Sequence, residues 1–220
     1  AMDYRDLKKL VRQGENLHLE FKLKANHPKK IVKEAVAFAN SEGGVLLIGV
    51  NDDREIRGLK YAEEDEFALT RALKKHCNPE IKYEYEKIPV ERDRDVLVFY
   101  IPKSSKVHYY KEDEKSKLGR AYIRIEDRSM KASPEMRDIL RGQKRRLSIK
   151  LNYGEKERIL MQYLQANERI TVDEFSKTAN IPRRVASRTL VLLVLAKVLK
   201  VIPNTLYDTD SFEFREQSFS

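Results

Sequence analysis

Cysteine is almost missing from the sequence, because Cys77 is the only one among 220 residues. An intramolecular disulfide is therefore impossible, and a lone thiol is typical of proteins kept in a reducing compartment. Long apolar runs are missing as well, since none approaches the roughly 20 residues that span a bilayer. No apolar signal core follows the first residues, Ala1-Met2-Asp3. These absences predict a cytoplasmic protein without a membrane partner.

Several catalytic motifs are also absent. The sequence contains no Gly-x-x-x-x-Gly-Lys-Ser/Thr loop, no Gly-x-Gly-x-x-Gly fingerprint and no Gly-x-Ser-x-Gly elbow. ATP or GTP hydrolysis through a phosphate loop is therefore not expected. The four histidines are scattered and Cys77 has no second cysteine, which argues against a zinc site. We expect no cofactor unless the chain is a metal-dependent enzyme, and an enzyme is the less favoured class.

Positive charge is what the chain has in excess. It carries 44 Lys and Arg against 35 Asp and Glu, a net charge of +9 with a pI of about 9.4. Such an excess favours a polyanionic partner, because neutralising phosphates releases their counterions; the alternative is a merely soluble basic surface. Residues 1–151 hold 34 basic and 26 acidic residues, whereas residues 152–220 hold 10 and 9. The densest basic stretch comprises Arg137, Arg141, Lys144, Arg145, Arg146 and Lys150.

The hydrophobic pattern of the first part alternates between helical and strand periods. Helical spacing starts at Tyr4, again after Pro28 and again through residues 67–73, and the next helix begins at Ser133-Pro134. Strand patterns cover residues 17–22, 45–50, 81–86, 96–101 and 121–125. The polar residues of 17–22 are expected on the far face of a half-buried strand. This order predicts a mixed-sheet α/β or α+β domain over residues 1–141.

A second, smaller domain is expected over residues 152–220, after a basic linker at 142–151. One helical stripe runs through residues 159–164, a capping box at Thr171–Glu174 opens a second helix, and a third follows Ile181-Pro182. Strand patterns at 198–202 and 212–214 flank a polar turn at residues 204–210. Three helices and a hairpin in this order predict a winged-helix domain.

Acidic residues form the first candidate site. Glu15 and Glu20 flank a short segment, and Asp52 follows the 45–50 strand. Three carboxylates brought together could hold Mg²⁺ or Mn²⁺, with Lys22 on the same strand face as Glu20 to stabilise developing negative charge. The alternative is ordinary polar alternation on a solvated strand.

Basic residues form two further candidates for nucleic-acid binding. Arg120, Tyr122 and Arg124 alternate along one strand, where arginine could bind phosphate and tyrosine could stack on a base, or both could simply pack and pair within the sheet. The third helix of the second domain begins with basic residues and continues with an apolar run that needs covering on all sides. The expected contacts are Arg120, Tyr122, Arg124, Arg128, Lys131, Arg141, Lys144, Arg145, Arg146, Arg183, Arg184 and Arg188.

Four segments together resemble a known family. They are residues 15–22, 37–44, 48–52 and 56–58, followed by a later motif at 119–124 with Ser129 and Ala132. In this order they resemble the Schlafen-like AlbA family over roughly residues 7–141, and the tail resembles the winged helix that often follows it in prokaryotic transcriptional regulators. One departure is Arg54, which stands where the family often has glycine.

The resemblance implies an α/β domain that binds nucleic acid, DNA in preference to RNA, in a transcriptional regulator. A homodimer is expected from the apolar third helix and from the two-fold symmetry of operator binding. The alternative comes from the resemblance to the Schlafen nucleases. It implies a metal-dependent RNA endonuclease that uses Glu15, Glu20 and Asp52 with Mg²⁺ or Mn²⁺. A third hypothesis is a protein-interaction module in which the apolar third helix binds a partner chain.

Overall fold

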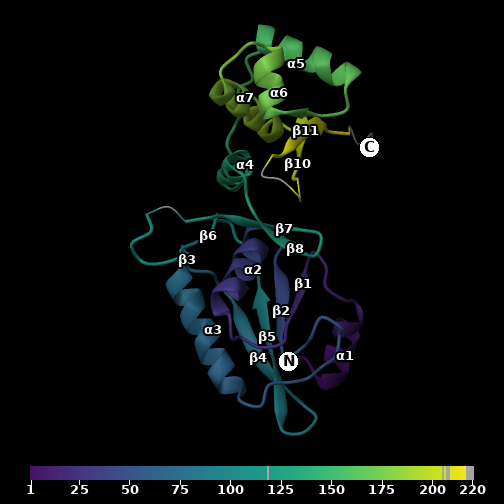
Figure 1. Ribbon diagram of the computed structural model, residues 1–220, viewed down its shortest axis with the longest axis vertical. Coiled ribbons are helices and arrows are strands. Elements are labelled where there is room, and N and C mark those ends of the chain that lie inside the picture. The colour runs from purple at the N-terminus through teal and green to yellow at the C-terminus, as the bar shows by residue number, and fades with distance from the viewer. Residues whose placement is uncertain (118, 205, 207–208, 217–220) are drawn as a thin grey trace. The chain divides into compact units, whose positions relative to one another are not determined.

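The computed structural model describes residues 1–117, 119–204, 206 and 209–216. Its internal contacts divide the chain into two units, Ala1–Lys131 and Ala132–Ser220 (Figure 1). Each unit has its own hydrophobic core within the described residues. The expected mixed α/β fold with a smaller second part is therefore confirmed.

A four-stranded sheet organises the first unit. Its strand order is β1-β2-β5-β4, with β1 parallel to β2 and the other neighbours antiparallel. The central strand β2 carries the continuous apolar run expected of a strand covered on both faces. The sheet strands are β1 (Leu19–Lys22), β2 (Gly44–Ile48), β4 (Glu84–Val90) and β5 (Arg94–Ile101). Strands β1 and β4 begin later than their predicted ranges.

Helices cover both faces of this sheet. Alternate residues of β2 belong to the cores on opposite faces of the sheet, because successive side chains of a strand point in opposite directions. Leu46 and Ile48 join the core beneath α2 and α3, whereas Leu47 joins the core beneath α1. The helices are α1 (Tyr4–Arg12), α2 (Pro28–Asn40) and α3 (Ala62–His76) (Figure 1).

Two small strand pairs complete the first unit. Strand β3 (Cys77–Asn78) pairs with β6 (Tyr109–Tyr110), and β7 (Tyr122–Ile125) forms an antiparallel hairpin with β8 (Arg128–Lys131). The β7–β8 hairpin packs on α2. It therefore lies on the same side of the sheet as the polar residues of β1, which decides the environment of those residues.

The second unit is a helical cluster with a three-stranded antiparallel sheet of order β10-β11-β9. Its core includes Phe175, Leu190 and Phe212. The predicted capping box is present, since Thr171 Oγ1 accepts from the Glu174 amide and Glu174 accepts from the Thr171 amide. The elements are α4 (Pro134–Arg145), α5 (Glu155–Ala166), β9 (Ile170–Thr171), α6 (Val172–Thr178), α7 (Arg183–Leu195), β10 (Leu199–Ile202) and β11 (Ser211–Phe214).

Helix α4 belongs to the second unit, although the sequence pattern placed the end of the first domain at residue 141. The helix packs on α7, and a Cβ on Gly142 would come within 2.5 Å of the Leu195 side chain. Helix α7 accordingly meets α4, α6 and β10 within one unit, which covers much of its apolar run. Three residues of the polar turn predicted at 204–210, Thr205, Tyr207 and Asp208, lie outside the described residues.

Candidate nucleic-acid interface and a buried charge network

The polar face of β1 is covered, not solvated. Because Leu19 and Phe21 face the α1 side, Glu20 and Lys22 point to the α2 side. The Lys22 ammonium lies 2.5 Å from Glu20 Oε1 and 3.4 Å from Glu34 Oε1 on α2. Burial lowers the pKa of Lys22, but its hydrogen bond and ion pairs with these carboxylates outweigh burial and raise the pKa overall. This corrects the expectation of a half-buried strand.

Arg124 completes the network from β7. Its side chain is 0% exposed, and its Nη1 atom lies 2.8 Å from Glu20 Oε2 and 3.1 Å from Glu34 Oε2. The guanidinium also donates to Ser129 Oγ and to the carbonyl oxygens of Asn16 and Leu19. The planar guanidinium thus binds two carboxylates and two backbone carbonyl oxygens at once. Arg124 therefore ties the hairpin to β1 and α2.

The predicted binding face on the 120–124 strand is therefore only partly exposed. Arg124 is sequestered in ion pairs and Tyr122 is buried, because the hairpin lies on α2 instead of standing free. This corrects the expectation that both side chains are available to a phosphate or a base. Three other cations of this region, Arg120, Arg128 and Lys131, are exposed. They remain candidates for contacts with the phosphates of a nucleic acid.

Glu15 lies beside this network with an altered acidity. Its Oε1 atom accepts a hydrogen bond of 2.9 Å from the Phe21 amide. Burial, together with the neighbouring charge of Glu20, raises the pKa of Glu15 to about 7, although the Phe21 amide and Lys22 act in the opposite direction. Around neutral pH this carboxyl group is thus divided between its neutral and charged forms.

Glu15 is expected to make the folded state less stable as the pH rises from about 4.5 to about 7. Over that interval an unfolded glutamate loses its proton, while the folded chain still holds it, so the unfolded state is favoured progressively. With Glu15→Gln, the urea concentration at the midpoint of unfolding should therefore decrease less between pH 5 and pH 8 than it does in the parent protein. Glu114→Gln, at an exposed site away from the network, serves as the control. A pH profile unchanged by Glu15→Gln contradicts this assignment.

Asp52 does not complete a metal site with the two glutamates. It is exposed in the turn after β2, whereas Glu20 is already held by Lys22 and Arg124. Across the described ranges, no group of three or more His, Cys, Asp or Glu is placed to hold a metal ion. The residues therefore fit Mg²⁺ or Mn²⁺ poorly, because such ions need several oxygen ligands around one point.

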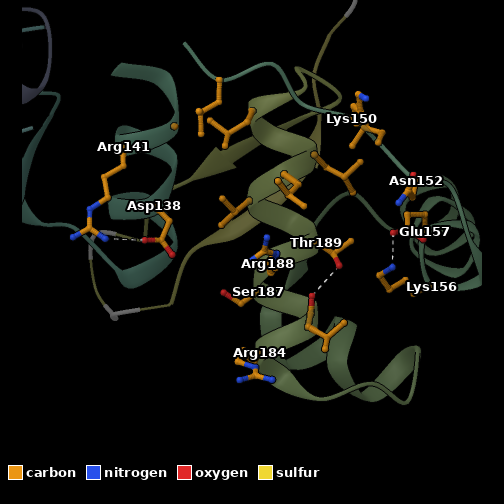
Figure 2. A pocket seen from close by; sticks show the side chains of 18 of the residues that line it. Asp138, Arg141, Lys150, Asn152, Lys156, Glu157, Arg184, Ser187, Arg188 and Thr189 are labelled. Carbon is orange, nitrogen blue, oxygen red and sulfur yellow. Dashed lines mark hydrogen bonds and ion pairs between the residues drawn. The ribbon is translucent and has the colours of Figure 1, made fainter. Parts of the chain in front are cut away.

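A basic groove lies in the second unit. It has a volume of about 890 Å³ and is lined by α4, α7, the start of α5 and the segment 147–152 (Figure 2). Its apolar lining residues are Leu147, Leu151, Val185, Val191, Leu192, Leu193 and Leu195. Its basic lining residues are Arg141, Arg145, Lys150, Lys156, Arg184 and Arg188.

Few acids oppose these cations. Asp138 lies 3.5 Å from Arg141, and Glu157 lies 2.8 Å from Lys156. In the described part of the chain, Arg145, Lys150, Arg184 and Arg188 form no ion pair. Four positive charges without a counter-charge around one hollow make a surface that attracts a polyanion.

The groove gathers predicted residues that are distant in sequence. Arg141, Arg145, Arg184 and Arg188 meet there, whereas Arg183 lies 2.8 Å from Asp173, and Lys144 and Arg146 do not line the groove. Sequence reasoning missed Lys156, and it included Lys150 in the basic stretch at 137–150 but not among the expected contact residues. The charge run alone could not reveal that the segment after α4 lines the same groove as α7.

The comparisons with known proteins concern the first unit. The family model described as Schlafen, AlbA_2 matches residues 15–133, and the chain belongs to this family. No curated protein matches the sequence. In the described helices, none is long and apolar enough to cross a membrane.

Solved structures also show partial likeness, including these two. One is the N-terminal domain of a Nitrosomonas europaea protein named as related to the ATP-dependent DNA helicase RecG, with 25% identity over 57% of this chain and 90% of that chain and a TM-score of 0.43. The other is the DIP2311 protein from Corynebacterium diphtheriae, with 17% identity over 53% of this chain and 25% of that chain and a TM-score of 0.37. At these TM-scores the family assignment rests on the sequence match.

Proposed function

We propose that this protein binds duplex DNA through the basic groove of its second unit and acts as a transcriptional regulator. The observation that carries the proposal is the convergence of Arg145, Lys150, Arg184 and Arg188 on one groove without ion pairs among the described residues. Arginine binds phosphate oxygens as a planar fork. Membership of the Schlafen, AlbA_2 family is consistent with nucleic acid as the partner.

The order of elements in the second unit supports a winged-helix assignment. Helices α5, α6 and α7 are followed by the β10–β11 hairpin, and the short strand β9 before α6 pairs with β11. In this class the last helix is the one that enters the major groove, and its N-terminal residues contact bases or phosphates. Arg184 and Arg188 occupy that end of α7 and are exposed.

We extend the proposal to a homodimer. The dimer contact is assigned to the segment between α4 and α5, where Leu147, Leu151 and Tyr153 are 54%, 44% and 67% exposed. Large apolar side chains gathered on a surface are typical of contacts with a partner, and two-fold symmetry suits paired half-sites on DNA. Light scattering that gives the monomer mass of 25.8 kDa at micromolar concentration contradicts the dimer.

The salt dependence of DNA affinity tests the proposed function. Each neutralised phosphate contributes about −0.9 to the slope of log K against log salt, so four groove cations predict a slope of about −3.6 or steeper. Fluorescence anisotropy with a labelled duplex between 50 and 200 mM salt should then show affinity falling about a hundredfold. A slope shallower than about −1 contradicts binding through this groove.

A further inference from the structure

A second basic hollow lies in the first unit, between α1 and the turn after β2. It has a volume of about 380 Å³, and six residues line it: Tyr4, Lys8, Val11, Arg12, Arg54 and Ile56. Half of these residues are cations and none is an acid. The hollow is separate from the buried Arg124 network, because Arg124 and its carboxylate partners do not line it.

The three cations have no acidic partner. In the parts of the chain that the structure describes, Lys8, Arg12 and Arg54 form no ion pair. Lys8 and Arg12 are four residues apart on α1, so both project from one helix face. The Lys8 ammonium lies 4.8 Å from the centre of the Tyr4 ring, which keeps it on that face.

A hydrogen bond to the backbone of α1 holds the Arg54 side chain at the same hollow. Its Nη1 atom donates to the Arg12 carbonyl oxygen at 3.2 Å, and its guanidinium lies against Gly14. A Cβ on Gly14 would come within 2.7 Å of Arg54 Nη2, so a side chain at position 14 would displace the guanidinium from this place. Arg54 itself has a φ of 63°, a value that favours glycine.

We propose that this hollow binds a phosphate group through Lys8, Arg12 and Arg54. Three cations around a shallow hollow without a carboxylate in its lining suit a compact dianion. The remaining N–H donors of Arg54 can bind phosphate oxygens while Nη1 holds the end of α1. The site is independent of the basic groove of the second unit, since the two share no residue.

Arg54→Gly tests the phosphate site without disturbing the fold. Glycine adopts a φ of 63° without strain, so this variant should stay folded while it removes one of the three cations. Arg92→Gly is the matched control, because Arg92 is also exposed, also has a φ of 63° and lies in the turn between β4 and β5. Lys8→Gln/Arg12→Gln, at two exposed positions of α1, provides a second variant.

Amide chemical shifts of the full chain, titrated with pyrophosphate, measure the binding. We expect shifts at Lys8, Arg12 and Arg54, with an affinity about tenfold weaker in Arg54→Gly and unchanged in Arg92→Gly, since one lost charge-assisted hydrogen bond corresponds to roughly that factor. The double α1 variant should lose the shifts. Absence of these shifts in the parent protein, or equal affinity in Arg54→Gly, overturns the proposal.

Two further probes identify the source of the phosphate. If duplex DNA shifts the same amides and pyrophosphate competes with it, the site takes backbone phosphates; if adenosine 5′-monophosphate shifts them and DNA does not, it takes a free phosphate compound. Both outcomes support the site. Arg184→Gln/Arg188→Gln should bind pyrophosphate at this hollow like the parent, so failure of the DNA-binding proposal would leave this one testable.

Discussion

Replacing Arg124 with alanine is expected to lower the free energy of unfolding of the first unit by about 3–5 kcal/mol. Among the described residues, the substitution leaves Glu20 and Glu34 on the covered side of the sheet with Lys22 as their one remaining ion-pair partner. It also leaves the carbonyl oxygens of Asn16 and Leu19 without the guanidinium donor. A buried charge that loses its partner keeps the cost of desolvation without the attraction that offset it.

Urea unfolding followed by circular dichroism measures this loss. Arg120→Ala is the matched control, because Arg120 is exposed and precedes the same strand, and its expected effect is below about 0.5 kcal/mol. Arg124→Lys should fall between the two, since lysine keeps the charge but not the fork that reaches both carboxylates. If Arg124→Ala costs less than about 1 kcal/mol, the network does not hold the hairpin to the sheet.

Arg124 illustrates what the sequence could and could not reveal about the first unit. The alternation of Arg120, Tyr122 and Arg124 correctly indicated a strand, because period two is a local property. Whether that strand face meets water or α2 depends on tertiary packing, which the alternation does not encode. Glu20 and Lys22 gave a hint. They lie on β1, which pairs with β2, and if helices cover both faces of β2, the polar side chains of β1 on the same face need partners.

Several helix starts could be predicted because their signals are local. Pro28 and Pro134 occupy first turns, and the Ser133 hydroxyl accepts from the Met136 amide as a cap should. Strands β3 and β9, by contrast, have two residues each, too few for any periodicity. Their pairing is decided by segments far along the chain.

The basic groove is a second feature that local sequence signals could not predict. The sequence singled out the basic run at 137–150 and the arginines at the start of α7 separately, without a reason for them to share a surface. Their meeting depends on α4 packing against α7, which Gly142 permits by leaving space for Leu195. Contact between segments some 40 residues apart is a property of the folded core.

Removing two cations from that groove should weaken DNA binding strongly. For Arg184→Gln/Arg188→Gln we expect duplex affinity at 0.15 M salt to fall about a hundredfold, because each lost charge-assisted hydrogen bond costs about 1.5 kcal/mol and 1.4 kcal/mol is a factor of ten. The slope of log K against log salt should become shallower by about 1.8, since two phosphate contacts disappear. Both side chains are exposed, so the fold should be unaffected.

The control must remove the same charge from the same unit. Arg158→Gln/Arg169→Gln does so, because Arg158 pairs with Glu155 on α5 and Arg169 pairs with Glu213 at 2.9 Å, and neither lines the groove. A long-range effect of net charge would weaken binding equally in both double variants. Contact through the groove predicts a loss confined to the α7 pair, with at most a few-fold change in the control. Equal losses would therefore show that duplex DNA does not lie along Arg184 and Arg188.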